Sequence, residues 1–159
     1  MPTEKDWFCH QVRSCQNGLY HLAISILKNE SDAQDAVQEA LFKAYDHLGE
    51  LKQKDKFKPW LMRILSNVAY GMLRGRKITM DLNAWEELPQ NNTLDIHTKI
   101  TLWDTVQALP AGYRIVIVLY YYENLTIKEI GGITGLTPAT VKKRLSRARE
   151  QLKAVLKEV

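Results

Sequence analysis

Apolar residues recur at steps of three and four along almost the whole chain, and this helical period is the feature that most limits its fold. The pattern is clear over residues 6–28, 33–48 and 57–73, and it returns after residue 98. No segment alternates polar and apolar residues with the period of two that indicates a strand. The sequence therefore predicts an all-α protein.

Between residues 78 and 98 the helical period is lost. This segment contains a turn-forming polar run that starts at Pro89, four acidic residues, and no Lys or Arg. About twenty residues without regular structure are unusual inside one compact domain, but they are common between two domains. We therefore predict an N-terminal helical domain over residues 1–77, a flexible acidic linker over 78–98, and a C-terminal helix-turn-helix domain over 99–159.

Several short patterns indicate where helices begin. Ser31 and Thr126 each stand three residues before a Gln or Glu, which is the spacing of a capping box, and Thr137 precedes a proline at an expected first helical position. Residues 49–56 are expected to form a loop. Residues 114–122 are apolar nearly all round; they would also suit a buried strand, but their neighbours are helical, so we expect a buried helix.

Composition narrows the class of protein. The 159 residues are 45% apolar and 25% charged, as in soluble globular proteins. The longest apolar run, residues 115–122, is far shorter than the roughly 20 residues of a membrane-spanning helix. Cys9 and Cys15 form neither a zinc set nor a disulfide framework, and the first residues show no secretion signal. We expect a cytoplasmic protein without a metal site or a cofactor.

Charge is distributed unevenly along the chain. The net charge of +4 is too small to indicate an anionic partner by itself. However, residues 52–63 carry five basic residues and one acid, and residues 142–153 carry six basic residues and one acid. These two basic segments lie on either side of the acidic stretch 78–98. The pattern is expected if two surfaces contact nucleic acid and the segment between them does not.

The C-terminal basic segment fits a helix-turn-helix. Gly131 supplies a small residue where the two helices cross, and Gly135 supplies a turn residue that can adopt a positive φ. The expected buried positions are Ile130, Val141, Leu145 and Ala148. The expected DNA-facing positions are Thr137, Ala139, Thr140, Lys142, Lys143, Ser146, Arg147 and Arg149. Short side chains near the start of a helix and cations beyond them suit insertion into a major groove. An ordinary helical hairpin with a solvated basic face remains the alternative.

The first basic segment leads into a helix with one polar face. This face carries Arg63, Asn67, Tyr70, Arg74 and Lys77, which follow one another at steps of four and three. An aromatic ring can stack on a base and an amide can read a base edge, so the face suits single-stranded nucleic acid. A solvated helix face would show the same spacing.

The preceding helix is acidic on its outer face. It carries Asp32, Asp35, Gln38, Glu39 and Asp46. The helix dipole explains an acid near the N-terminus, such as Asp32, but not the later acids. This face could dock a basic partner protein, or it could simply be solvated.

Two other classes of function fit the sequence less well. A one-component helix-turn-helix regulator would need a ligand pocket or a dimer surface within residues 1–77, and none is evident. A small nuclease would need a catalytic constellation, but the four histidines are scattered and no nucleophile or metal motif appears. Asp35 and Glu39 could share one metal ion, although Lys43 follows on the same face. We therefore expect no catalytic residue.

Taken in order, these segments resemble the extracytoplasmic-function (ECF) group of bacterial sigma factors. The resemblance covers about residues 10–153. It is carried by DAVQEA at 35–40, FKPWLMRILSN at 57–67, LP at 109–110 with an arginine at 114, EI at 129–130, and TVKKRLSRAR at 140–149. Two positions depart from the family pattern: Gly71 replaces a residue that is more often polar, and Gly131 replaces a more usual alanine.

The resemblance implies a role for each surface. Asp35, Gln38 and Glu39 would dock on core RNA polymerase. The loop around Leu51 and the face of Arg63, Asn67, Tyr70, Arg74 and Lys77 would open the minus-ten element of a promoter and hold a flipped base. The last helix would read the minus-thirty-five element as duplex DNA. The resemblance also implies an anti-sigma protein as a further partner, and no small-molecule substrate.

Overall fold

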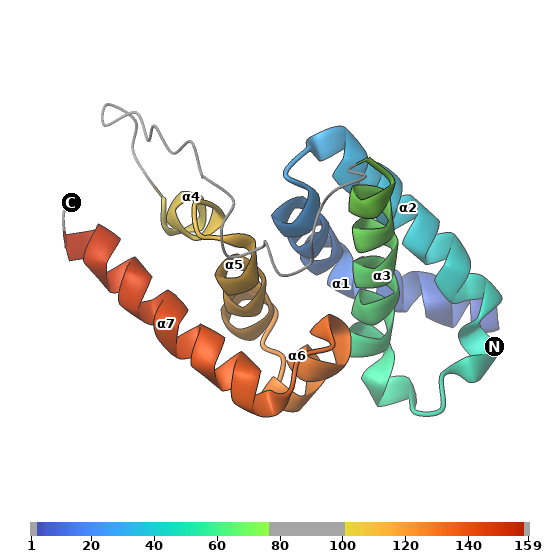
Figure 1. The fold of residues 1–159 in the computed structure, drawn as a ribbon. Helices are drawn as coiled ribbons and strands as arrows, with labels where there is room; N and C mark the ends of the chain where they lie inside the picture. The colour runs from blue at the N-terminus through green and yellow to red at the C-terminus, as the bar shows by residue number, and fades with distance from the viewer. Residues whose placement is uncertain (1–2, 77–100, 158–159) are drawn as a thin grey trace. The chain divides into compact units, whose positions relative to one another are not determined.

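A computed structural model describes residues 3–76 and 101–157, and every regular element within these ranges is helical (Figure 1). The all-α prediction is therefore confirmed for the described part of the chain. The chain divides into two compact units. The predicted linker over residues 78–98 lies outside the described residues, and so does Lys77.

The first unit is built on three long helices, α1 (Glu4–Leu27), α2 (Glu30–Asp46) and α3 (Phe57–Arg76), and each packs against the other two (Figure 1). Large apolar side chains of α1 and α3 fill the core, among them Leu19, Leu22, Leu61, Met62 and Leu65. The buried stripe of α2 consists instead of Ala33, Ala36, Ala40 and Ala44. Because alanine is small, the backbone of α2 can approach its two neighbours closely, while its outer face stays free for polar residues.

The start of α2 differs from the prediction. The N-cap is Asn29, whose side-chain oxygen accepts a hydrogen bond from the backbone N–H of Asp32 at 2.9 Å, and Ser31 already lies inside the helix. The reason is the end of α1, where Lys28 adopts a left-handed conformation with φ of 57° and stops that helix sharply. The chain turns within one residue, so Asn29 rather than Ser31 is placed to cap.

The connection from α2 to α3 is more ordered than a plain loop. It contains two short 3-10 turns, η1 (Leu48–Glu50) and η2 (Lys54–Lys56). Phe57 then starts α3, and its ring meets the rings of Trp7 and Phe8 edge-on at centroid distances of 5.3 and 5.7 Å. These aromatic contacts fasten the beginning of α3 to α1.

The C-terminal elements are α4 (Leu102–Gln107), α5 (Ala111–Ile117), η4 (Val118–Tyr122), α6 (Ile127–Thr134) and α7 (Pro138–Lys157), with α7 packed against α4 and α5. The prediction of a buried helix over residues 114–122 is confirmed for residues 114–119, but Tyr120 and Tyr122 are only half-buried and Tyr121 is 50% exposed, because the end of the helix reaches the surface. The helix ends in η4, a π-helical turn in which the N–H of Glu123 donates to the carbonyl of Val118 at 3.1 Å. Residues 115–119 are all buried.

Each unit opens with the same capping arrangement. Thr3 caps α1 with Asp6, and Thr101 caps α4 with Asp104, each pair exchanging two hydrogen bonds of 3.0–3.1 Å. Hydrogen bonds from the threonine hold the pKa of each carboxyl below its ordinary value. The capping boxes therefore depend on ionised carboxylates.

Candidate nucleic-acid interface

The two helices of the predicted helix-turn-helix begin where the sequence indicates. At α6, the hydroxyl of Thr126 accepts from the N–H of Glu129 at 3.1 Å, and the Glu129 carboxylate accepts from the N–H of Thr126 at 3.0 Å. At α7, the hydroxyl of Thr137 accepts from the N–H of Thr140 at 3.2 Å, and Pro138 is the first helical residue. Both predicted helix starts are thus confirmed.

Two glycines make the connection between α6 and α7 possible. Gly135 has a φ of +80°, which an L side chain rarely adopts. A Cβ added to Gly131 would lie 2.8 Å from the carbonyl oxygen of Leu136. Position 131 therefore has no room for a Cβ unless the backbone shifts, which explains a glycine there despite its weak helix propensity.

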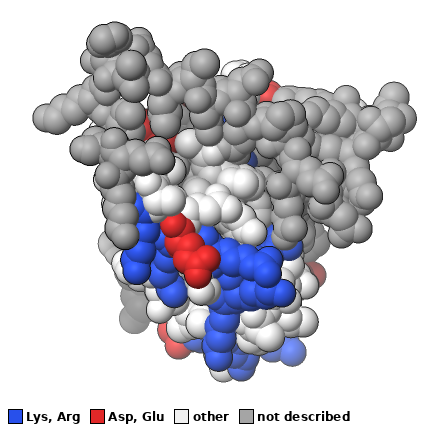
Figure 2. All heavy atoms as spheres, turned by 60° about the vertical axis from the view of Figure 1, so that its left-hand side comes forward, with Lys and Arg blue, Asp and Glu red and all other residues white. Residues whose placement is uncertain are grey.

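The two sides of α7 separate as predicted. Val141, Leu145 and Ala148 are buried at 1% exposure or less, and Ile130 of α6 is fully buried. We define the α7 face as the exposed residues Ala139, Lys142, Lys143, Ser146, Arg147 and Arg149. Thr137 is exposed beside it, and Thr140 is half-buried. Figure 2 looks from the side of Figure 1 on which α7 lies and shows Lys and Arg gathered on one surface with an acid among them.

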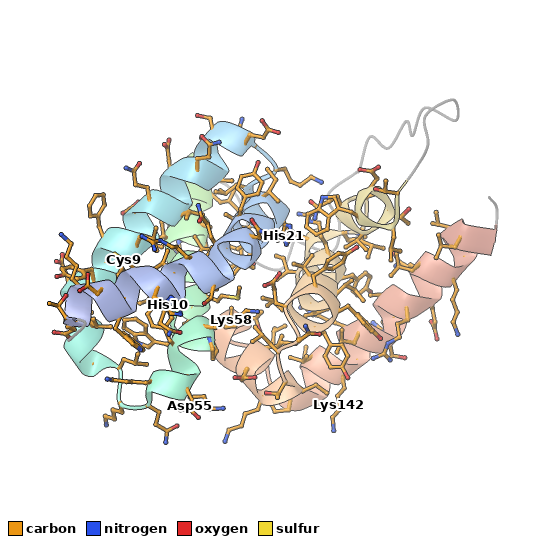
Figure 3. All side chains as sticks on the ribbon, turned by 180° about the vertical axis from the view of Figure 1, so that it is seen from behind. Cys9, His10, His21, Asp55, Lys58 and Lys142 are labelled. Carbon is orange, nitrogen blue, oxygen red and sulfur yellow. The ribbon has the colours of Figure 1, made fainter. Side chains whose placement is uncertain are left out.

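Two arginines of α7 have distinct settings. Arg144 is half-buried and turns toward α5, where its Nη1 lies 2.7 Å from the position that a Cβ on Gly112 would occupy. Arg149 is exposed, and its Nε donates a 2.6 Å hydrogen bond to the hydroxyl of Tyr121. The α7 face therefore includes most, but not all, of the cations of the helix. Lys142, which belongs to this face, lies on the outer side of α7 (Figure 3).

The polar face of α3 is only partly exposed. We define the α3 face as Arg63, Asn67 and Arg74, which are all exposed. Tyr70 is half-buried and its hydroxyl oxygen has almost no contact with solvent. Gly71 leaves the helix intact, since α3 continues to Arg76 and an added Cβ would meet only the tip of Arg74 at 4.0 Å.

Arg63 and Asn67 line a hollow of about 430 Å³ between the end of α2 and α3. Its lining comprises Lys43, His47, Glu50, Trp60, Arg63, Ile64, Asn67 and Val68. The hollow combines an aromatic ring, an amide and three potential cations, which is the chemistry that holds an unstacked base with its phosphate. Sequence reasoning missed the contributions of Lys43, His47 and Trp60. Trp60 had a signal, because it lies one turn before Arg63 on the same helix.

Leu51 lines a separate hollow of about 540 Å³. This second hollow is formed by Thr3, Glu4, Trp7, Leu48, Gly49, Leu51 and Lys54. The ammonium group of Lys54 lies 5.3 Å from the centroid of the Trp7 ring, a cation–π contact that orders the loop against α1. Among the residues predicted for the minus-ten element, Arg63 and Asn67 thus line one hollow and Leu51 lines another, whereas Tyr70 and Arg74 line neither of these two.

The acidic face of α2 is exposed at every residue predicted to bind a partner. Asp35, Gln38 and Glu39 are all exposed, and Glu39 forms an ion pair of 3.5 Å with Lys43. Both side chains of this pair are about half exposed, so it contributes little stability. Farther along the helix Asp46 is exposed, whereas Asp32 is half-buried near the N-terminus.

An apolar side chain stands among these acids. Phe42 is 67% exposed and lies one turn beyond Glu39. Sequence reasoning did not assign Phe42 a role, although its position off the apolar stripe of α2 was a signal. Tyr45 lies within the helical apolar period of residues 33–48, yet it is 46% exposed, and its ring meets that of Phe8 in a T-shaped contact at a centroid distance of 5.3 Å. The face therefore presents both charge and apolar area.

The described residues contain no cluster suited to metal binding. Within residues 3–76 and 101–157, no group of three or more His, Cys, Asp or Glu side chains gathers in a way that could hold a metal ion. His10 and His21 lie well apart on α1 (Figure 3). Neither Cys9 nor Cys15 forms a disulfide, and Cys15 is buried. None of the helices described is long and apolar enough to span a bilayer.

Two segments of the chain match known family models. Residues 11–78 match the model described as Sigma-70 region 2, and residues 99–152 match the model described as Sigma-70, region 4. The first match contains α3 and most of α1, and the second contains the helix-turn-helix. The two models together cover nearly all of the described residues.

Individual relatives are similar over most of their length. The ECF RNA polymerase sigma factor SigW of Bacillus subtilis is 30% identical over 98% of this chain and 92% of its own. The RNA polymerase sigma factor SigV of the same organism is 34% identical over 86% of this chain and 83% of its own. The sigma factor RpoE from Bartonella quintana, crystallised in complex with the anti-sigma factor NepR, has a TM-score of 0.72 at 25% identity and covers 94% of this chain and 96% of its own.

Proposed function

The chain belongs to the sigma-70 family as an ECF RNA polymerase sigma factor, and on this premise we propose that it binds core RNA polymerase, directs it to specific promoters and helps to melt their minus-ten elements. Sigma factors are transcription initiation factors and not enzymes, so the expectation of a non-catalytic protein follows from the family. The main support for the residue-level roles is that each of the two matched regions carries its own exposed basic face.

Transcription in a reconstituted system tests the proposal directly. The full-length chain is added to bacterial core RNA polymerase with genomic DNA as template, and the transcript starts are sequenced. We expect starts that share two upstream elements and that vanish when the chain is left out. Core polymerase that initiates no differently with and without the chain would contradict the proposal.

We assign duplex recognition of the minus-thirty-five element to the C-terminal domain, residues 99–159. The α7 face offers short side chains at the start of the helix and cations farther along. The first residues of a recognition helix contact base edges, and later cations contact phosphates. On this basis Thr137, Ala139 and Thr140 lie closest to the bases, and Lys142, Lys143, Ser146, Arg147 and Arg149 complete the interface.

We assign capture of the minus-ten element to the N-terminal domain, residues 1–77. Extruding a base from the stack costs a few kcal/mol, which stacking and hydrogen bonds available only to the extruded base can offset. The hollow beside Trp60, Arg63 and Asn67 offers both kinds of contact. We place the flipped base there, with Tyr70, Arg74 and Lys77 farther along the same helix and Leu51 in the neighbouring hollow on the path of the strand.

The acidic face of α2 is assigned to core RNA polymerase. Asp35, Gln38 and Glu39 would meet a basic surface of the polymerase, and Phe42 would add an apolar contact at the same place. Large aromatic side chains that become buried at the centre of an interface often carry much of its binding energy. The segment 78–98, with its four acids, would connect the two domains without binding DNA.

The proposal also covers location and regulation. Because bacterial polymerase and promoter DNA are found in the cytoplasm, we place this protein there as well. The structurally similar RpoE was crystallised with an anti-sigma factor, and we infer that a protein of this class also binds the present chain. A one-component regulator and a small nuclease, the two alternatives considered from the sequence, receive no support from the relatives.

A further inference from the structure

A tyrosine outside the helix-turn-helix touches the α7 face. Of the three consecutive residues Tyr120, Tyr121 and Tyr122, only Tyr121 is exposed, at 50%. Its hydroxyl accepts the 2.6 Å hydrogen bond from Nε of Arg149, and the guanidinium carbon of Arg149 lies 5.8 Å from the centroid of its ring. A hydrogen bond and a cation–π contact thus join the same two side chains across 28 positions of sequence.

The backbone around Tyr121 is shaped for this contact. Tyr121 lies in the π-helical turn η4, which takes in one more residue than an α-helical turn and so rotates the side chains in it relative to the preceding helix. Its neighbours also limit its motion. Tyr120 meets its ring edge-on at 4.9 Å, and Tyr122 packs against Trp103 at 5.0 Å, with burial raising the pKa of the Tyr122 phenol. Tyr121 is therefore a braced side chain at the surface.

Arg149 lies where a recognition helix reaches the edge of the groove. It is the twelfth residue of α7 and stands on one stripe with Lys142 and Ser146, at steps of four and three. Arg149 follows Lys142 by seven positions, which corresponds to about 10 Å along the helix axis. If residues near the start of α7 contact bases, Arg149 meets the phosphate backbone beside the groove.

We propose that Tyr121 is a positioning residue for promoter binding, which holds the guanidinium of Arg149 in the orientation that contacts a phosphate of the minus-thirty-five duplex. This inference rests on the proposed role of α7. Nε is engaged by Tyr121, so a phosphate would bind through the two terminal nitrogens of the guanidinium. A free arginine side chain loses much rotamer freedom when it binds, and an arginine that is already held loses less.

The test distinguishes the contribution of the Tyr121–Arg149 hydrogen bond to DNA affinity from the contribution of the Arg149 charge. Holoenzyme is assembled from core polymerase and the full-length chain, and its affinity for a labelled duplex carrying a mapped upstream element is measured over a series of salt concentrations. Tyr121→Phe keeps the ring and the Arg149 charge but removes the acceptor. We expect about fivefold weaker binding with an unchanged salt slope, because no phosphate contact is lost outright. Arg149→Ala should weaken binding further and reduce the salt slope by about one.

Two further variants complete the design. In the Arg149→Ala background, Tyr121→Phe should have no additional effect, because its partner is gone. Tyr120→Phe removes a neighbouring phenol from the same turn and should bind like the original chain. Equal affinity of Tyr121→Phe and the original chain, or an additive loss in the double variant, would overturn the proposal. If Lys142→Ala and Arg149→Ala both leave affinity unchanged, it is the role of α7 itself that fails.

Discussion

The α3 face and the α7 face use similar side chains on surfaces of different shape. Both present arginine with polar neighbours on an exposed helix side. On α3 the residues border a hollow of about 430 Å³ that contains an aromatic ring, whereas the α7 face is made of exposed side chains along a helix that Pro138 and Thr137 begin cleanly. A hollow suits a single base that has left the stack, and an exposed helix suits the groove of an intact duplex. Because both faces are basic, charge alone does not indicate which face suits an unstacked base and which suits an intact duplex.

We expect the largest effect from a substitution that prevents binding to core polymerase, because neither the α3 face nor the α7 face can then act on a promoter. Glu39→Lys reverses a charge on the acidic face of α2, and if that face docks on polymerase, the affinity for core should fall by about 2–4 kcal/mol. Titration of labelled chain with core polymerase measures this. Glu30→Lys makes the same reversal on the opposite side of α2 and should bind core normally. Equal affinities for Glu39→Lys and the original chain would remove α2 from the interface.

The next prediction isolates the α3 face. Asn67→Ala deletes the amide beside Trp60 and should slow promoter melting about tenfold, since a lost amide–base pair costs about 1–3 kcal/mol. Duplex binding upstream should stay intact. Opening is followed with a fluorescent base in the minus-ten element, and Asn17→Ala on the exposed side of α1 serves as the control. If Asn67→Ala reduced melting and upstream binding equally, the two faces would not be separate in function.

A substitution on the α7 face should instead impair binding to the upstream duplex more than melting of the minus-ten element. Lys142→Ala should weaken binding of holoenzyme to the upstream duplex about threefold to tenfold and lower the salt slope by about one. A template already opened at the minus-ten element should bypass part of this defect. Lys153→Ala removes the same charge three turns farther along α7 and should matter less. A melting defect with normal upstream binding in Lys142→Ala would invert the assignment of the faces.

The smallest effect concerns the two capping boxes, which are alike in both units. Hydrogen bonds from Thr3 and Thr101 keep the pKa values of Asp6 and Asp104 below the ordinary value of 3.8. A depressed carboxyl pKa contributes stability that is present above about pH 4 and is lost as the pH falls through the lower, folded value. Thr3→Ala and Thr101→Ala should each return only the adjacent pKa toward 3.8, as measured by carboxyl carbon NMR. A shift at both sites in either variant would show that the boxes are not independent.

Local signals in the sequence predicted the helices well. The apolar period located all the long helices, and the caps at Thr126 and Thr137 were found because they depend on residues only three positions apart. Ser31 was a wrong cap, since the deciding event was the left-handed turn at Lys28. Nothing in the sequence indicated the π-helical turn in the buried helix, because its apolar residues fit either helical geometry.

The sequence predicts which residues share one face of a helix, but it does not predict which residues of different elements line a hollow together. Helical spacing places Arg63 and Asn67 on one side of α3, and Lys142, Ser146 and Arg149 on one side of α7, whatever surrounds them. The hollows bring residues of different elements together, such as His47 with Asn67 and Trp7 with Leu51. Their sequence separations carry no periodic signal, so only the packing of the helices reveals them.

By itself, the sequence determined the all-α fold, the helix-turn-helix with its buried and exposed sides, and the segregation of charge, because each of these depends on neighbours within one or two helical turns. The tertiary structure alone decided that Leu51 and Asn67 line different hollows and that Tyr121 forms a hydrogen bond with Arg149. These arrangements follow from how closely helices approach one another, which small residues such as the alanines of α2 and Gly131 allow and which no local pattern records.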